Sequence, residues 1–310
     1  MDERTKNRFM SLREEITKRF KSITSNIDLS NYSWFNLGGP AEYLFKPENK
    51  EQLIEFLKQN KKDKLNITIL GAGSNTLIRD KGVKGVVIKL SSNFSNIKLI
   101  DNCIIEAGAA TLDRKVSNFA KENRIGDLEF LSCIPGSIGG AVIMNSGCYG
   151  NDISKILESI KVIDMEKCEE IEIKRNEIDF FYRGTNLSNR FIIISAKFKG
   201  KIKEKKIIEK IQNKLIEKKK LSQPSKIKTC GSTFKNLNDN NKKVWQLIRE
   251  TGCDNFTEGD AAISKKHCNF FVNHGKAKCS DIEKLINKVK KTVNKKTGIN
   301  LELEIKIIGE

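Results

Sequence analysis

The chain has 310 residues, of which 38% are hydrophobic and 31% charged, and this composition excludes wholesale disorder. Its formal net charge of +18 favours anionic partners such as nucleic acid, an acidic membrane or a substrate that carries phosphates. No apolar run is long enough to span a membrane, and the charged N-terminal stretch lacks a signal-peptide core. We therefore expect a cytoplasmic protein whose cysteines are reduced thiols.

The first 200 residues predict a mixed α+β region. Apolar residues at helical spacing over 1–30 predict a leading helix. Beyond it, short β-branched segments bounded by Gly, Asn or Ser predict strands, and segments with apolar residues three or four apart predict helices. The predicted strands are 41–47, 66–70, 85–90, 103–109, 159–165, 169–175 and 190–200, and the predicted helices are 48–60 and 111–123.

A lysine-rich segment separates this region from a second, smaller one. Residues 201–221 predict a long helix, and the proline in 222–226 predicts a break. We place a domain boundary close to residue 200. The lysines alternate with apolar residues at helical spacing, which is typical of the solvated face of an amphipathic helix. The second region predicts helices at 243–251 and 280–296 and strands at 269–273 and 301–308.

Two glycine-rich loops have the composition of backbone-mediated phosphate binding. The first is Gly-Ala-Gly-Ser-Asn, residues 71–75, directly after a predicted strand. The second spans residues 135–150 and reads PGSIGGAVIMNSGCYG. Glycine permits positive φ and lets backbone N–H groups approach a pyrophosphate without an intervening Cβ. One such loop is often only a tight turn, whereas two in one region favour a dinucleotide-like ligand.

The first loop does not fit the Rossmann fingerprint. That motif requires a third glycine, where this chain has Thr76, and an acidic residue about 20 positions later. Residues 91–95 read Ser-Ser-Asn-Phe-Ser and contain no acid. The loop is therefore interpreted as a phosphate loop of a different fold.

Several motifs in order carry a family resemblance. LGGPAEYLF, ILGAGSNTLIRDKGVKGVVIKL and IPGSIGGAVIMNSGCYG resemble the FAD-binding domain of the vanillyl-alcohol-oxidase type. DFFYRGTNL, GSTFKN, SKKHCNFFVNHGKA and LELEIKIIG then resemble the UDP-N-acetylenolpyruvoylglucosamine reductase (MurB) family, over residues 31–309. The short interval between Arg183 and Ser232 resembles the branch of that family that lacks a tyrosine-bearing insertion.

The resemblance implies an α+β fold and a flavoenzyme. It implies an FAD-binding domain over 31–200, with subdomains at about 31–95 and 96–200, and a substrate domain over 201–310. It also implies non-covalent FAD, NADPH as co-substrate, and reduction of UDP-N-acetylglucosamine enolpyruvate to UDP-N-acetylmuramate for peptidoglycan synthesis. The implied FAD-binding residues are Gly71, Ala72, Gly73, Ser74, Asn75, Thr76, Pro135, Gly136, Ser137, Gly139, Gly140, Asn145 and Gly147.

The same resemblance assigns three catalytic residues. Ser232 is the expected proton donor to a carbanion-like carbon, although a serine after glycine is also typical of a turn or a helix cap. Arg183 is expected to clamp the substrate carboxylate, although a lone arginine more often forms a surface ion pair. Glu304 is expected to bond the developing enolic carboxyl group. Strand alternation places Glu302 on the same face, so only the resemblance selects Glu304.

Lys235, Asn236 and His267 match positions near the substrate in the family. The chain departs from the family pattern at three places: Gly184-Thr185 after the arginine, Leu237 after the asparagine, and Asp260 in a segment that is richer in glycine in relatives. These departures weaken expectations about the supporting contacts, and they leave Arg183 itself in place.

Three other interpretations fit the sequence less well. An FAD-linked alcohol oxidase of the same superfamily would often hold its flavin covalently through His or Cys, and the first 266 residues contain no histidine. A basic nucleic-acid-binding protein would leave the glycine loops without a purpose and lacks aromatics among its lysines. A zinc site from Cys253, His267, Cys268, His274 and Cys279 matches no paired-ligand spacing. We expect no metal, no nucleic-acid or membrane partner, and a monomer.

Overall fold

The computed structural model describes residues 17–237 and 242–310. The helix expected over 1–30 lies partly outside the described residues, because 1–16 are not among them. Within the described part residues 17–19 are helical, but the helix does not continue to residue 30: Ile23–Asp28 form strand β1, which pairs antiparallel with β2 (Pro40–Phe45). Ile23 is buried whereas most of β1 is exposed, so the strand is held by its pairing to β2 rather than by a local pattern.

The first sheet has the strand order β1-β2-β5-β3. Strand β5 (Val83–Ile88) lies parallel to both β2 and β3 (Ile67–Ile69). Helix α2 (Lys50–Asp63) packs beside this sheet; Asn49 caps its first turn by accepting a hydrogen bond from the Gln52 N–H, 2.8 Å. The rings of Phe45 and Phe56 lie 4.6 Å apart between helix and sheet.

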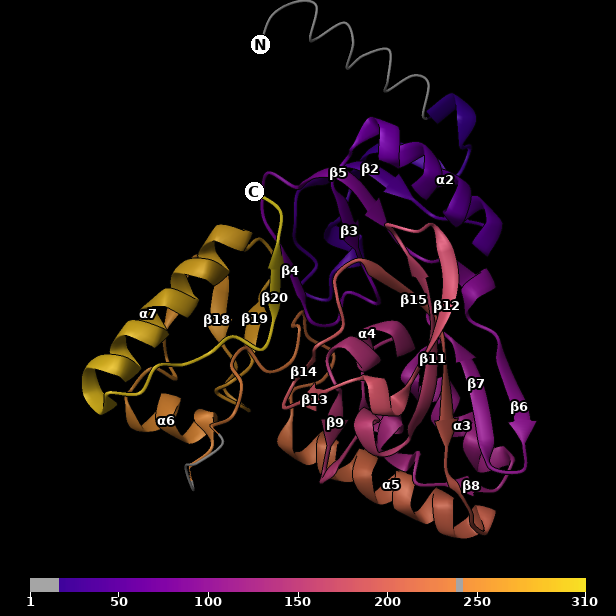
Figure 1. Cartoon of the computed structure of the whole chain (residues 1–310). Helices are drawn as coiled ribbons and strands as arrows, with labels where there is room; N and C mark the ends of the chain where they lie inside the picture. Colours follow the sequence, from indigo (N-terminus) through magenta and orange to yellow (C-terminus); the bar gives the residue numbers. More distant parts are fainter. Residues whose placement is uncertain (1–16, 238–241) are drawn as a thin grey trace, which may run out of the picture.

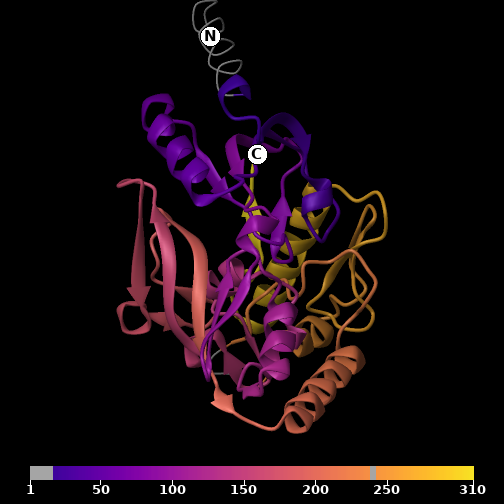
Figure 2. The ribbon, with the colours of Figure 1, turned by 90° about the vertical axis from the view of Figure 1, so that its right-hand side faces the viewer.

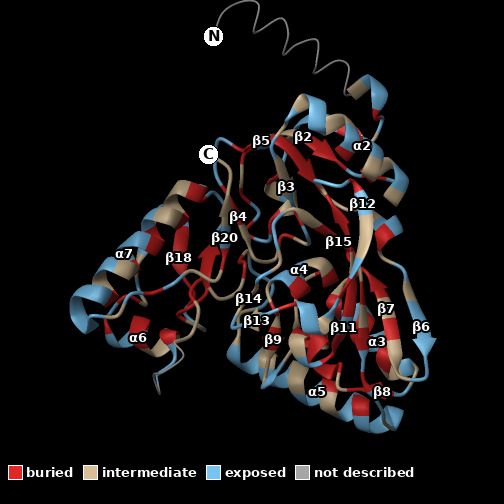
Figure 3. Cartoon of the chain, viewed as in Figure 1, coloured by how far each residue is buried: buried red, intermediate tan, exposed pale blue. Residues whose placement is uncertain are grey.

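The second sheet is antiparallel, with the order β12-β11-β15-β7-β6. Its strands are β6 (Ile97–Asp101), β7 (Ile104–Gly108), β11 (Leu157–Asp164), β12 (Glu169–Lys174) and β15 (Phe191–Lys199). The central strands are largely buried and the edge strand β6 is largely exposed (Figure 3).

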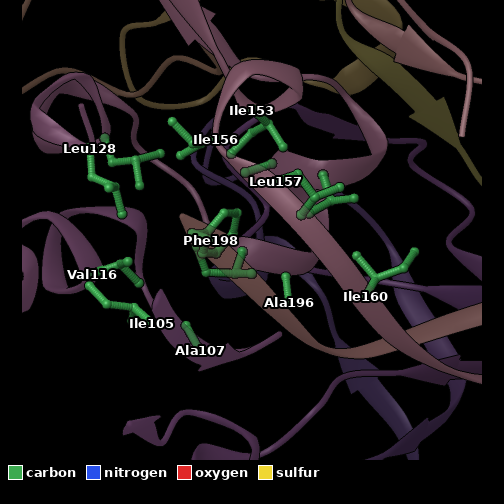
Figure 4. Packing of buried hydrophobic residues seen from close by; sticks show 14 of the residues in the cluster. Ile105, Ala107, Val116, Leu128, Ile153, Ile156, Leu157, Ile160, Ala196 and Phe198 are labelled. Carbon is green, nitrogen blue, oxygen red and sulfur yellow. The ribbon is translucent and has the colours of Figure 1, made fainter. Parts of the chain in front are cut away.

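The largest core cluster covers one face of this second sheet. Helices α3 (Asp113–Glu122) and α4 (Ile138–Ile143) and the 3-10 helix η3 (Glu129–Cys133) contribute apolar side chains to it. Phe198 is fully buried at its centre, between Val116 and Leu128 on one side and Leu157 on the other (Figure 4). This packing fixes the segments on which the second glycine loop is mounted.

Helix α5 (Lys205–Ser222) runs along the end of the molecule opposite the C-terminus (Figures 1 and 2). It packs against α3 and η3, with Ile208 and Gln212 buried. Gln212 Nε2 donates to Ser117 Oγ, 2.8 Å. These contacts attach α5 to residues 96–200, and the domain boundary expected near residue 200 stays a prediction. The lysines of α5 lie mostly in solvent, as the amphipathic pattern predicted. No helix in the described ranges is both long and apolar enough to cross a bilayer.

The C-terminal part is a small sheet covered by a long helix. Strands β17 (Thr257–Glu258), β18 (Ala261–Ile263) and β19 (Phe271–Asn273) form an antiparallel sheet. Helix α7 (Cys279–Thr297) packs on that sheet and on α6 (Val244–Glu250). The last strand, β20 (Lys306–Ile308), returns to the first region and pairs parallel with β4 (Thr76–Ile78). It is shorter than the predicted 301–308.

Short elements complete the structure and carry much of the candidate site. They are β8 (Ile125–Gly126), β9 (Gly147–Cys148), β10 (Asn151–Asp152), β13 (Phe180–Phe181), β14 (Gly184–Thr185), β16 (Lys201–Ile202), and the 3-10 helices Ser30–Tyr32, Ser92–Phe94, Ile153–Lys155 and Arg175–Glu177. The mixed α+β class expected from the sequence is confirmed.

Candidate active site

The two glycine loops lie against each other. The first leaves β3 and leads into β4, and the second, residues 135–150, contains α4 and β9. A Cβ added to Gly71 would lie 3.2 Å from Ser137 Oγ, and one added to Gly136 would lie 3.7 Å from Ser74 Oγ. Two loops that are some 60 positions apart in the chain therefore form one surface, as an extended, dinucleotide-like ligand requires.

The first loop exposes a row of backbone donors. Within the described part of the chain, the N–H groups of residues 71–74 have no hydrogen-bond acceptor. Gly73 adopts a φ of +70°, and a Cβ there would lie 1.8 Å from the Tyr32 carbonyl oxygen, so only glycine fits. Successive free N–H groups at a glycine turn form an anion-binding concavity. The loop thus fits a diphosphate.

The second loop has free backbone donors at its start. The N–H groups of Gly136 and Ser137 have no acceptor among residues 17–237 and 242–310. Gly139 instead donates to the Ala109 carbonyl, 2.9 Å. Gly147 is required where β9 turns toward β10, because its Cβ would lie 2.3 Å from the Asn151 carbonyl oxygen. Contact of these residues with FAD stays a prediction, as it does for Ala72, Thr76, Pro135 and Gly140.

Two amide side chains join the loops to other parts of the site. Asn75 Nδ2 donates to the Glu304 carbonyl, 3.0 Å, and its own carbonyl accepts from the Lys306 N–H, 2.9 Å. Asn145 Nδ2 donates to the Phe181 carbonyl, 3.2 Å. Both residues were expected to bind the cofactor. Their side chains hydrogen-bond within the protein, Asn75 to residue 304 before the C-terminal strand and Asn145 to the β13–β14 hairpin, and their contact with FAD stays a prediction.

A lysine beside the first loop was missed by the sequence analysis. Lys89 follows β5, and its Nζ donates to the Gly71 carbonyl, 2.5 Å. Burial, and after it the charge of Lys46, lowers the pKa of Lys89. Both ammonium groups lie over the Tyr32 ring, at 5.0 Å for Lys46 and 5.8 Å for Lys89. A phosphate beside the loop would offset the repulsion between the Lys46 and Lys89 ammonium groups. Nothing in the local sequence around Lys89 indicates its contact with residue 71.

A buried aspartic acid under the second loop was also missed. Asp113 begins α3 and is 0% exposed, and neither carboxyl oxygen has a hydrogen-bond partner in the described residues. A Cβ on Gly136 would lie 2.7 Å from Asp113 Oδ2, so glycine at 136 makes room for the carboxyl group. Burial raises the pKa of Asp113 well above its ordinary value. The group is therefore favoured as a neutral acid.

Arg183 and Glu304 meet, although 121 positions separate them in the chain. Arg183 occupies the turn of the β13–β14 hairpin with a φ of 59°. Its Nε donates to Glu304 Oε1 at 2.9 Å, and the two side chains are 22% and 15% exposed. The two terminal guanidinium nitrogens make no hydrogen bond within the described residues. The planar end of the guanidinium is thus left for a carboxylate.

Glu304 sits in a less polar environment than Glu302. Burial raises the pKa of Glu304, and the charge and hydrogen bond of Arg183 partly offset this effect. Glu302 is 76% exposed and pairs with Lys235 at 3.4 Å. The structure therefore distinguishes the two carboxylates that strand alternation leaves equivalent, and it gives Glu304 the position at the arginine.

Ser232 lies on the segment next to Glu304. The Glu304 N–H donates to the Thr233 carbonyl, 2.9 Å, and Ser232 itself bridges to Phe270. On the other side, Cys230 Sγ approaches the Gly73 carbonyl at 3.5 Å. The Ser232 hydroxyl makes no hydrogen bond in the described parts of the chain, so it serves neither as a helix cap nor in a turn. The segment thus runs between the first loop and Glu304.

The three expected substrate residues are placed less directly. Asn236 accepts a hydrogen bond from the Val244 N–H at 3.3 Å, where α6 begins. His267 packs against the rings of Trp245 and Phe270, at 6.2 and 4.8 Å, and burial lowers its pKa. Lys235 pairs with Glu302, as described above. Among the residues that the structure describes, no three His, Cys, Asp or Glu side chains gather as a metal site would require.

Comparison with known proteins gives one consistent result. Residues 41–173 match the model of an FAD binding domain, and residues 223–308 match the C-terminal domain of UDP-N-acetylenolpyruvoylglucosamine reductase. The second match begins directly after α5, in agreement with the packing of that helix.

Named relatives cover nearly the whole chain. A UDP-N-acetylenolpyruvoylglucosamine reductase of Pelagibacter ubique is 48% identical over 95% of this chain and 99% of the relative. The enzyme of that name from Rickettsia akari is 42% identical over 91% of this chain and 94% of its own. The crystal structure of MurB from Thermus caldophilus superposes with a TM-score of 0.80 at 30% identity, covering 91% of this chain and 98% of that one.

These matches confirm the resemblance that the sequence motifs indicated, including the FAD-binding fold. The free backbone donors of the first loop and the adjacent Lys89 fit the diphosphate of that cofactor. The chain therefore belongs to the UDP-N-acetylenolpyruvoylglucosamine reductase (MurB) family of FAD-dependent oxidoreductases.

Proposed function

We propose that the chain reduces UDP-N-acetylglucosamine enolpyruvate to UDP-N-acetylmuramate with NADPH in peptidoglycan precursor synthesis. The observation that carries this proposal is the 2.9 Å contact of Arg183 with Glu304, beside the segment that bears Ser232. It brings together an anion clamp, a carboxyl group and a hydroxyl group from distant parts of the chain. These are the groups that reduction of an enolpyruvyl ether requires.

FAD, when bound, supplies hydride chemistry between NADPH and the substrate. The residues proposed to hold it are the free N–H groups of 71–74, 136 and 137, with Lys89 beside the diphosphate. Asp113 lies below the second loop, where a neutral carboxyl group keeps the site free of a repelling negative charge. Non-covalent binding is proposed because the family resemblance implies it; both histidines lie far from the two loops in the chain, although Cys148 lies in the second loop.

The substrate half of the site positions a carboxylate and delivers one proton. Arg183 presents the terminal nitrogens of its guanidinium to the substrate carboxylate and stabilises the negative charge that grows there. Glu304 holds the Arg183 Nε and so fixes the orientation of the fork. The raised pKa of Glu304 favours a carboxyl group that can hydrogen-bond to an enolic oxygen of the substrate. Ser232 donates its hydroxyl proton to the α-carbon, which is a strong base at that stage.

The experiment separates the two half-reactions. FAD-loaded protein is mixed with NADPH without oxygen, and the bleaching of flavin absorbance is timed; the substrate is then added and the return of absorbance is timed. For Ser232→Ala we expect near-normal bleaching and a severe loss of the return step. Ser225→Ala, an exposed serine, is the matched control. Equal loss of both steps in the Ser232 variant would show that Ser232 is structural, and a protein that takes up no FAD would refute the proposed activity.

We further propose a cytoplasmic monomer with no nucleic-acid or membrane partner. The +18 charge is instead matched to the phosphates of FAD, NADPH and the sugar nucleotide. Light scattering on the FAD-loaded protein, with and without duplex DNA at about 0.15 M salt, tests the monomer and the absence of a nucleic-acid partner. A dimer mass, or retention of DNA at that salt, would contradict them.

A further inference from the structure

The position of the Ser232 hydroxyl depends on the main chain that carries it. In the parts of the chain that the structure describes, this hydroxyl makes no hydrogen bond, so no side-chain contact fixes its direction. Residues 229–235, all of them described, form no regular strand and pair through isolated bridges, Ser232 with Phe270 and Phe234 with Leu303. A residue that holds this short stretch of main chain therefore determines where the expected proton donor lies.

Asn269 holds the stretch with three hydrogen bonds. Its Oδ1 accepts from the Phe234 N–H at 3.0 Å, and its Nδ2 donates to the Phe234 carbonyl at 2.8 Å. Its own main-chain carbonyl accepts from the Thr233 N–H at 2.7 Å. A carboxamide offers one donor side and one acceptor, as a peptide group does, so the Asn269 side chain takes the place of a neighbouring strand.

Burial makes the Asn269 amide hard to replace. Asn269 is 2% exposed, and Thr233 and Phe234 are 0% exposed, so water does not reach the groups that it pairs. A buried peptide N–H or C=O group that loses its partner is strongly unfavourable. Aspartate would offer acceptors alone, and serine is too short to reach both Phe234 groups. Asparagine is thus matched to this position by its length and by its two kinds of polar atom.

A tight turn fixes Asn269 itself. The Phe270 N–H donates to the His267 carbonyl at 2.9 Å, and the Asn269 N–H donates to His267 Nδ1 at 3.3 Å. The His267 ring also packs edge-on against the Phe270 ring, with 4.8 Å between centroids. Because Nδ1 accepts a hydrogen bond, the imidazole carries no proton on that nitrogen. The turn and the buried amide together support residues 232–234.

We propose that Asn269 is a positioning residue of the reductase reaction, which orients the Ser232 hydroxyl by fixing the main chain of residues 232–234. On the other side of this stretch, the Glu304 N–H donates to the Thr233 carbonyl at 2.9 Å. A displacement of residue 233 therefore changes how the hydroxyl and the Glu304 carboxyl group lie relative to each other. A misplacement of about 1 Å can slow a chemical step about 100-fold. The inference rests on the proposed function and assigns no contact between Asn269 and the substrate.

The test follows the two half-reactions of FAD-loaded protein in a double-mutant cycle. Asn269→Asp replaces the Nδ2 donor with an oxygen that faces the Phe234 carbonyl. We expect NADPH to bleach the flavin at a near-normal rate, and the enolpyruvyl substrate to restore the absorbance about 100-fold more slowly. In the Ser232→Ala background, the same substitution should change the return step by less than about twofold, because the hydroxyl that Asn269 orients is gone. Asn287→Asp, at an exposed position of α7, is the matched control and should behave as the wild type.

Amide hydrogen exchange measures the support of the segment without any turnover. In FAD-loaded protein, a peptide that contains residues 229–235 should exchange severalfold faster in Asn269→Asp than in the wild type, while α5 stays equally protected. Asn269→Ser removes the amide without adding a charge and leaves room for a water molecule beside Phe234, so it serves if the aspartate variant does not fold. It should give the same results in both measurements.

The contrary results differ in what they overturn. Unchanged exchange of residues 229–235 would show that Asn269 does not hold the segment. A full further loss when Asn269→Asp is added to Ser232→Ala, or equal losses in the two half-reactions, would show that Asn269 supports the fold without orienting the hydroxyl. A wild-type protein that takes up FAD but is not reoxidised by the substrate would count against the proposed function, and hydrogen exchange would still decide whether Asn269 fixes residues 232–234.

Discussion

The buried carboxyl group of Asp113 makes the pH dependence of stability a direct test of the second loop. Its side chain is 0% exposed and has no hydrogen-bond partner in the described residues, and burial raises its pKa. A carboxyl group with a raised pKa holds its proton more tightly in the folded chain than in the unfolded chain. Its contribution to folding is therefore most favourable below the unfolded pKa of about 3.9 and weakens as the pH rises toward the folded pKa.

The magnitude follows from proton linkage. Between those two pKa values each pH unit removes about 1.4 kcal/mol from the free energy of unfolding. Asp113→Asn keeps the shape of the side chain and removes the titration. The variant should therefore gain about 1.4 kcal/mol per pH unit relative to the wild type across that window. Guanidinium unfolding at several pH values, with the same excess of FAD, measures the difference.

A matched variant corrects for the lost charge. Asp101→Asn removes a carboxylate from an exposed position on β6, so the Asp113 effect is taken relative to that variant. Infrared spectroscopy gives an independent readout, because a protonated carboxyl band should be present in the wild type and missing in Asp113→Asn. A stability difference that does not vary with pH, together with no such band, would refute the neutral-acid interpretation.

Three further variants probe the two halves of the site. Lys89→Met should weaken FAD binding by about 10- to 100-fold, which corresponds to the loss of a hydrogen bond to a charged group, and should leave riboflavin binding unchanged. Flavin fluorescence measures both affinities, with Lys98→Met as the control. Equal losses for the two flavins would contradict a contact between Lys89 and the diphosphate. Gly73→Ala should cost at least about 1–2 kcal/mol in unfolding free energy for the left-handed φ alone, measured by thermal unfolding, and an unchanged Tm would show that the turn can relax. Arg183→Lys should lower kcat/KM about 10- to 100-fold, because an ammonium group cannot reproduce the two parallel hydrogen bonds of a guanidinium to a carboxylate. Near-normal turnover would show that Arg183 does not bind the substrate carboxylate.

Much of the fold was predictable because its signals are local. Helices α2, α3 and α7 follow apolar periodicity, and the central strands are short β-branched segments between turn residues. Strand β1 was mistaken for helix because its sequence, ITSNID, has no alternation and its conformation depends on pairing with β2. Helix α4 was missed because the glycines of IGGAVI read as loop.

The site was predictable only where a motif marked it. The glycine loops are visible from composition, and Arg183, Ser232 and Glu304 came from the family resemblance. The preference for Glu304 over Glu302 has a physical basis, burial against Arg183, that no spacing rule contains. Lys89 and Asp113 carry no signal in their own neighbourhoods, because what distinguishes them is contact with residues 18 and 23 positions away.

The parallel pairing of β20 with β4 has a consequence for the order in which the protein acquires its parts during translation. Strand β4 leaves the ribosome about 230 residues before its partner, and Glu304 precedes that partner by two positions. The cofactor loops can thus be complete while the acid that orients Arg183 is still unmade. A nascent chain that already holds flavin is therefore expected to be unable to turn over the sugar nucleotide until its final strand docks.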